Sequence, residues 1–130
     1  MGYKRAKRKM KKLMILLTTL FGLGLTINAN NYNVLDPSPK TAHVNGDRKD
    51  ATVTVRFERF VGNTLTLGFS AQNLCFSPVN VWVRVYYSDG HNDHFETVQG
   101  KAAMNKTYSY NFKLSNKIYM LKSFNISDVK

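Results

Sequence analysis

The sequence VNVWVRVYY at residues 79–87 decides the fold class of this chain. Valine occupies every second position, at Val79, Val81, Val83 and Val85, and larger or polar side chains lie between these valines. Because successive side chains of a β-strand point to opposite faces of a sheet, this alternation predicts a strand with its valine face turned to a core. β-Branched residues also fit the pleated surface of a sheet. We therefore predict a half-buried strand here.

Further runs of apolar residues share this period of two, and turn-forming residues separate them. No stretch after residue 29 has a helical period. Six or seven short antiparallel strands of this kind predict an all-β fold, a small immunoglobulin-like β-sandwich over residues 51–130. The further runs are Val53–Phe57, Leu65–Ala71, a shorter one around Phe95–Gln99, Tyr108–Leu114, and a less regular one over Ile118–Ile126. The expected turns are Gly62-Asn63, Ser88-Asp89-Gly90, Gly100-Lys101 and Ser115-Asn116.

The N-terminus has the pattern of an export signal. Residues 1–12, MGYKRAKRKMKK, hold seven of the 19 lysines and arginines and no acidic residue. The apolar run at residues 13–27 that follows is shorter than the ~20 residues of a membrane-spanning helix. We predict a helical signal peptide over residues 1–29, cleaved near Ala29, with an uncleaved anchor as the alternative and Met10 as a second candidate start. We therefore expect the product to be secreted or associated with the cell envelope, and to meet a membrane only through this segment.

Length and charge exclude several classes of protein. The 130 residues allow one domain, preceded by a polar linker at residues 30–50 with at most one short strand near Tyr32–Leu35. The formal net charge is +11, but the residues after 12 carry 12 basic and 8 acidic side chains, a net charge of only +4. These basic residues are scattered along the sequence. We therefore predict no nucleic-acid partner, because such partners need a basic patch on the folded surface.

The single cysteine, Cys75, allows no intrachain disulfide. It lies between Leu74 and Phe76, and this apolar setting predicts a buried, inert thiol. A reactive or lipid-carrying thiol is the alternative.

Few residues are suited to catalysis. The chain has three histidines and no nucleophile or phosphate-loop motif, so we predict no enzymatic activity and no cofactor. The densest polar cluster is DGHNDH at residues 89–94. Carboxylates and imidazoles can bind calcium or zinc, but Asp-Gly between two alternating runs is also a strong hairpin signal. We predict a turn without a metal.

The polar side of residues 79–87 is a candidate binding surface. If the valines point inward, Trp82, Arg84 and Tyr86 share the outer face of the strand. Aromatic rings beside a guanidinium can stack on the C–H face of a sugar and bind its hydroxyl groups. We place Tyr87 or His91 at the rim of this platform. The alternative is that this face is also buried, or that its aromatic residues only stabilise the sheet through cross-strand contacts.

Several motifs follow one another in a suggestive order. They are FE at residues 57–58, LTLG at 65–68, QNLCF at 72–76, VWVR at 81–84, DG at 89–90 and YSYNFKL at 108–114. Their order resembles carbohydrate-binding module family 21, whose members bind starch and glycogen. His91 stands near the place where that family commonly has a glucan-binding tryptophan. The resemblance implies a β-sandwich that binds an α-glucan.

Two functions follow as hypotheses. The first is a secreted, non-catalytic carbohydrate-binding module for an α-glucan such as starch or glycogen. The alternative is an immunoglobulin-like secreted or surface protein that binds another protein through an edge or a face of a sheet.

Overall fold

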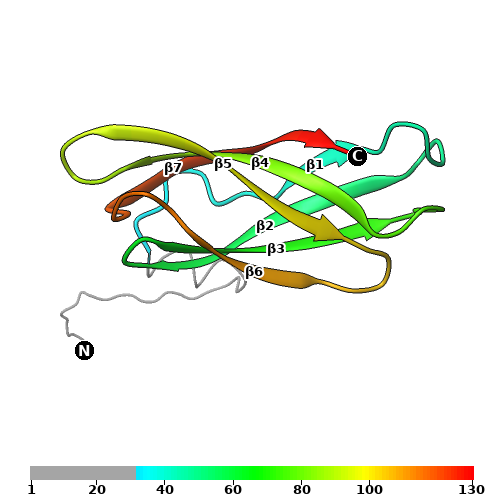
Figure 1. Cartoon of the computed structure of the whole chain (residues 1–130), viewed down its shortest axis with the longest axis horizontal. Coiled ribbons are helices and arrows are strands. Elements are labelled where there is room, and N and C mark those ends of the chain that lie inside the picture. Colours follow the sequence, from blue (N-terminus) through cyan, green and yellow to red (C-terminus); the bar gives the residue numbers. More distant parts are fainter. Residues whose placement is uncertain (1–31) are drawn as a thin grey trace, which may run out of the picture. The chain divides into compact units, whose positions relative to one another are not determined.

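The computed structural model describes residues 32–130, which form seven β-strands and no helix (Figure 1). The all-β prediction is thereby confirmed for this part of the chain. The predicted signal peptide over residues 1–29 lies outside the described residues. The strands are β1 (Lys40–His43), β2 (Thr52–Val61), β3 (Thr64–Gln72), β4 (Val79–Ser88), β5 (Asp93–Ala102), β6 (Tyr108–Lys113) and β7 (Met120–Val129).

In residues 32–130 we find no helix with the length and apolar character needed to cross a membrane.

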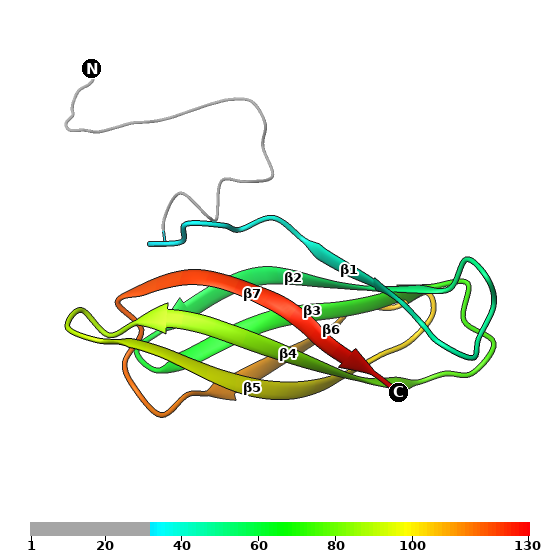
Figure 2. The same cartoon turned by 90° about the horizontal axis from the view of Figure 1, so that it is seen from above.

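The strands form two antiparallel sheets, in the orders β1-β2-β3-β6 and β5-β4-β7. The sheets lie as two layers (Figure 1), and β7, β4 and β5 run side by side in one of them (Figure 2). This arrangement is a β-sandwich of four and three strands. In a constant immunoglobulin domain the second and third strands lie in different sheets. Here β2 and β3 form a hairpin within one sheet, so the strand order is not that of a constant immunoglobulin domain.

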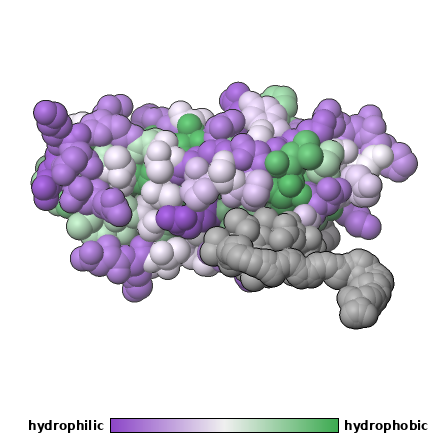
Figure 3. Space-filling view, turned by 180° about the vertical axis from the view of Figure 1, so that it is seen from behind, coloured by the Kyte–Doolittle hydropathy of each residue, from purple (hydrophilic) through white to green (hydrophobic). Residues whose placement is uncertain are grey.

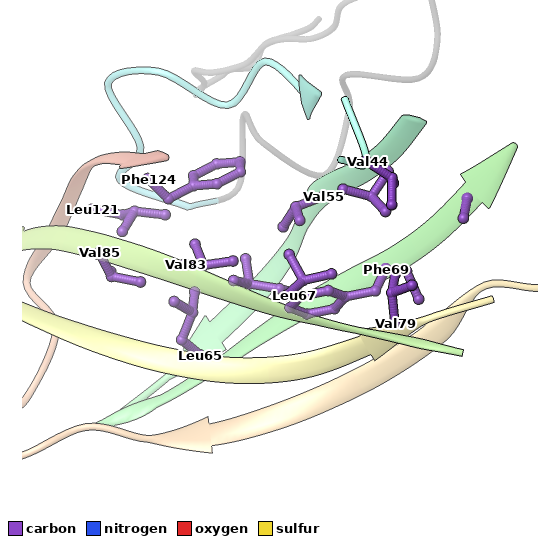
Figure 4. Close-up of a cluster of buried hydrophobic side chains, with 14 of the residues drawn as sticks. Val44, Val55, Leu65, Leu67, Phe69, Val79, Val83, Val85, Leu121 and Phe124 are labelled. Carbon is purple, nitrogen blue, oxygen red and sulfur yellow. The ribbon is translucent and has the colours of Figure 1, made fainter. Parts of the chain in front are cut away.

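The core lies between the two sheets and is built from the alternating residues of each strand. Val81, Val83 and Val85 of β4 are completely buried, as the alternation predicted. Leu65 and Leu67 of β3 are equally buried in the opposite sheet (Figure 4). Burial of apolar surface at roughly 25 cal/mol per Å² is the main favourable contribution to folding. The other completely buried members are Ala51, Val53, Val55, Phe69, Tyr87, Ala102, Leu121 and Phe124.

Two of the predicted elements are wrong in their position or length. The linker contains a strand, but it is β1 at Lys40–His43 and not the expected Tyr32–Leu35. The earlier segment instead bridges to β7, because the Leu35 N–H donates to the Leu121 carbonyl at 2.9 Å. The run expected to be short is the ten-residue β5, and Gly100 lies inside this strand rather than in a turn.

The hairpin turns that flank the longest strands are where the sequence placed them. Gly62 connects β2 to β3 with a φ of +61°, a left-handed conformation that suits glycine. Gly90 has a φ of +100° in the connection between β4 and β5. Pro78 directly precedes β4, as expected for a proline that cannot donate a ladder hydrogen bond. The turns at Gly62 and Gly90 make β2 and β3, and β4 and β5, antiparallel neighbours.

Candidate functional site

The outer face of β4 carries the three platform residues that the sequence predicted. Val81, Val83 and Val85 fill the inner face, so Trp82, Arg84 and Tyr86 point away from the core. Arg84 is exposed, whereas Trp82 and Tyr86 are half-buried by their neighbours on the same face. The alternative of a second buried face does not hold for β4.

Phe95 joins this face from the neighbouring strand, and sequence reasoning missed it. Phe95 is 63% exposed, and it pairs with Tyr86 in the register of β4 and β5. The two ring centroids lie 6.1 Å apart, with the ring planes inclined by 36°. A two-residue turn at Asp89-Gly90 would have placed Asp93 opposite Tyr86. The observed register, in which Ser88 pairs with Asp93, brings Phe95 to that position instead.

Arg84 connects the two strands on this face. Its guanidinium carbon lies 5.5 Å from the centroid of the Phe95 ring, within the range of a cation–π contact. Thr97 is the direct partner of Arg84 on β5, and Asn125 is its partner on β7. The guanidinium is therefore flanked by an aromatic ring, a hydroxyl and an amide, groups that can contact a polar ring-shaped ligand.

Trp82 lies at the other end of the face and also has a cation beside it. The Nζ of Lys130 lies 5.9 Å from the centroid of the Trp82 ring and 3.5 Å from Asp128. Across the strands, Gln99 pairs with Trp82 from β5 and Asp128 pairs with it from β7. The tryptophan thus has a partner amide on one side and a lysine–aspartate pair on the other.

We define the platform as Trp82, Arg84, Tyr86 and Phe95 on the outer face of the β5-β4-β7 sheet. Residues two apart on a strand are separated by roughly 6.6 Å, and neighbouring strands by about 4.8 Å. The platform can therefore offer ring faces and hydrogen-bonding groups over an extended, flat area.

Tyr87 does not belong to the platform, contrary to the prediction that it could form the rim. Its side chain is completely buried because it continues the inner face of the β4 valines. Its hydroxyl bonds to the carboxylate of Glu96 and accepts a hydrogen bond from the Asn116 N–H at 3.2 Å. Burial raises the pKa of this hydroxyl. Tyr87 therefore has a structural role at one end of the core.

The polar cluster at residues 89–94 stabilises the hairpin turn. The Asp89 Oδ1 accepts hydrogen bonds from the backbone N–H groups of His91 and Asn92, both at 2.7 Å. His94 Nε2 lies 2.7 Å from the other carboxylate oxygen. The backbone hydrogen bond from Asn92 and the contact with His94 hold the pKa of Asp89 well below its usual range. These bonds account for the composition of the cluster.

His91 is exposed in this turn, beyond the end of β4. The described residues contain no group of three histidine, cysteine, aspartate or glutamate side chains that could hold a metal.

Cys75 is exposed, which corrects the prediction of a buried thiol. It lies in the connection between β3 and β4, where the Asp47 carboxylate accepts hydrogen bonds from the N–H groups of Cys75 at 2.7 Å and Phe76 at 3.0 Å. Partial desolvation and the nearby Asp47 raise the pKa of the thiol, so it is protonated and weakly nucleophilic at neutral pH. The same bonds hold Phe76 with 68% of its surface exposed.

A small polar pocket of about 190 Å³ lies between β1 and β7. His43 and Asn45 line one side, and Ser127 and Asp128 line the other. Asp128 is the β7 partner of Trp82, so the pocket adjoins the margin of the platform sheet.

No protein-family model matches this chain, and neither a curated protein nor a solved structure shows significant similarity to it.

Proposed function

We propose that this chain is an exported, non-catalytic carbohydrate-binding protein that binds a polysaccharide on the platform. The observation that carries this proposal is the gathering of three aromatic rings and one guanidinium on one outer sheet face. The predicted signal peptide at residues 1–29 supports export.

The chemistry of the platform suits a sugar chain. Aromatic rings can stack on the apolar C–H faces of sugars, while their hydroxyl groups need hydrogen-bonding partners at the edge. Gln99 and Asn125 offer amides beside the platform, and Thr97 offers a hydroxyl. The resemblance to carbohydrate-binding module family 21 makes starch or glycogen the first neutral polymer to test.

A binding role without catalysis agrees with the placement of the two described glutamates. Both Glu58 oxygens accept hydrogen bonds from Ser109, at 2.8 and 3.0 Å. Glu96 accepts hydrogen bonds from Tyr87 and Ser115 near one end of the core. Neither glutamate lies on the platform face, where a glycoside hydrolase would need two neighbouring carboxylates. The aspartates of that sheet, Asp93 and Asp128, lie at opposite ends of it, and each is paired with a lysine.

The experiment is retention of the purified protein on insoluble starch and on an array of immobilised polysaccharides. Trp82→Ala and Phe95→Ser should each weaken retention at least about tenfold, a loss of about 1.4 kcal/mol of binding energy. Phe76→Ser is the matched control, because it removes an exposed aromatic ring from a different surface. Folded protein that is retained on no glycan would refute the proposal.

A protein partner is the second candidate function, and the exposed Phe76 favours it. Asp47 holds the backbone of this residue in place, and a rigid exposed aromatic side chain is a common anchor in protein interfaces. The test is the capture of one defined partner from the cell envelope or the host in the presence of excess glycan. Phe76→Ser should abolish that capture, and Phe95→Ser should not.

A further inference from the structure

We propose that the platform prefers an acidic polysaccharide, one whose carboxylates are spaced along the chain by neutral sugars, over a neutral glucan. This inference rests on the proposed carbohydrate-binding function and adds the charge class of the ligand. It follows from the distribution of charged residues over the outer face of the β5-β4-β7 sheet.

Two cations on this face make no ion pair with any carboxylate of residues 32–130. Arg84 projects from the middle of β4, and Lys101 projects from β5 opposite Asn80. Both side chains are exposed. The ion pairs in the described part of the chain involve other residues. These two positive charges are therefore available to a ligand.

The acidic residues on the outer face of this sheet lie at its two ends, and each is paired with a lysine. Asp93 lies 2.9 Å from Lys122, and Asp128 lies 3.5 Å from Lys130. No carboxylate lies between them on the platform itself. An anionic ligand would thus meet two free cations and no uncompensated acid.

The contact of Arg84 with Phe95 leaves the guanidinium suited to a carboxylate. Arg84 is exposed, and it meets the Phe95 ring in a cation–π contact at 5.5 Å from the centroid rather than in a hydrogen bond, so its N–H donors can still reach a ligand. Those donors match the two oxygens of a carboxylate, in a charge-assisted pair stronger than a neutral hydrogen bond. A neutral polymer would cover Arg84 and remove water from it without supplying a countercharge.

The spacing of the two cations favours sparse charges on the ligand. Arg84 of β4 pairs with Thr97 of β5, and Lys101 lies four residues after Thr97 on β5. Four strand residues correspond to about 13 Å. Lys101 pairs with Asn80, so the half-buried ring of Trp82 lies between the two cations along β4 and can stack on a sugar there, whereas the ring of Tyr86 lies beyond Arg84 on the same face. Uronic-acid polymers with intervening neutral sugars have this character, whereas densely sulfated chains do not.

The test uses hyaluronan, whose uronic acids alternate with neutral sugars, and pectate, which carries a carboxylate on every sugar, and compares each with its own form after chemical reduction of the carboxylates. Starch and single-stranded oligothymidine complete the set of immobilised probes. We expect native hyaluronan to bind about tenfold more tightly than its reduced form and more tightly than pectate, and high salt to weaken the preference for the native form through screening. Equal binding of native and reduced polymers would overturn the inference. Tighter binding of the oligothymidine would overturn it as well.

The variants separate this inference from the proposed function. Arg84→Gln and Lys101→Gln should each bring the ratio of native to reduced binding close to one. Lys113→Gln makes the same charge change on β6 of the other sheet and should leave the ratio unchanged. Tight, charge-independent binding of starch would refute only the acidic ligand, whereas failure to bind any glycan would refute the binding function too. A ratio of native to reduced binding that stays high in both Arg84→Gln and Lys101→Gln would also refute the inference. Thermal unfolding of each variant confirms that it is folded.

Discussion

The ring of Phe69 lies directly against the backbone of Gly100, and the two residues come from opposite sheets. A Cβ atom at Gly100 would lie 2.8 Å from Cζ and 2.9 Å from Cε1 of the Phe69 ring. Both residues are buried, and Phe69 also meets the rings of Tyr110 and Phe112 edge-on. The glycine therefore lets β5 approach the core closely, and β5 is the strand that carries Phe95.

This contact predicts that Gly100→Ala destabilises the fold. The added methyl group must displace a ring that is enclosed by other aromatic side chains, and such overpacking costs about 1–3 kcal/mol. Denaturant unfolding measures the loss. Phe69→Leu should relieve the collision, so the double variant should be less destabilised than the sum of the single variants. Additive effects of the two substitutions would contradict the direct contact.

The alternation of apolar and polar residues could predict where the strands lie and which face of each strand is buried. An apolar side chain at every second position is enough to mark a half-buried strand. The period identified β4 and its outward Trp82, Arg84 and Tyr86. By the same period Tyr87 shares the inner face of the valines, and its placement at the rim departed from that rule. The buried position of Tyr87 was therefore within reach of the sequence.

The strand neighbours were beyond the reach of the alternation. A period of two does not say that β6 pairs with β3 or that β7 pairs with β4, because those pairs form between segments distant in sequence. Gly100 shows a second limit. From the sequence, Gly100 and the lysine after it were expected to form a turn. Only the Phe69 ring across the core explains why a glycine lies inside this strand. The exposure of Cys75 likewise depends on Asp47, a distant residue that binds the backbone of its loop.

Trp82→Ala should lower stability much less than the loss of a core aromatic residue. The tryptophan is half-buried on the outer face, so we expect a cost of about 1 kcal/mol. Phe69→Ala should cost about 3–5 kcal/mol, because it opens a cavity in the core. Urea unfolding of the two variants provides the comparison. Similar losses would mean that Trp82 contributes to packing in the same way as a core residue.

Trp82 is the only tryptophan, so its fluorescence reports on the platform alone. A neutral quencher should reach the half-exposed ring in the free protein. Saturation with a bound polysaccharide should reduce that quenching, because a stacked sugar covers the indole. Quenching that stays the same in the fully bound protein would remove Trp82 from the binding face.

Tyr87→Phe should destabilise the end of the core by about 1–2 kcal/mol, because it removes a hydroxyl bonded to Glu96 and Asn116. Burial raises the pKa of this hydroxyl above its ordinary value of 10.0. The wild type should therefore lose stability as pH rises above about 10, since the unfolded state ionises first. The Tyr87→Phe variant should not show the part of this stability loss that comes from the ionisation of Tyr87. Tyr119→Phe is the control, because Tyr119 is exposed. This variant should lose stability with rising pH in the same way as the wild type.

Asp47→Asn should reduce the acid sensitivity of the fold. Partial desolvation acts to raise the pKa of Asp47, but hydrogen bonds from the N–H groups of Phe76, Cys75 and Arg48 outweigh it and hold this pKa at about 2. The ordinary value is 3.8, so the unfolded chain takes up the proton first as pH falls. The stabilisation by ionised Asp47 is complete above roughly pH 4 and is lost as pH falls toward 2.

Thermal unfolding between neutral pH and about pH 2 measures this effect. At neutral pH Asp47→Asn should unfold at a lower temperature than the wild type, because an amide accepts weaker hydrogen bonds than a carboxylate. The two melting temperatures should converge as pH falls from about 4 to 2, where Asp47 becomes neutral in both states. Asp50→Asn is the control from the same loop, because its carboxylate lies 3.6 Å from Arg48 and does not bind the backbone of residues 75 and 76. A difference between Asp47→Asn and the wild type that stays constant across this pH range would show that the carboxylate charge does not hold the loop.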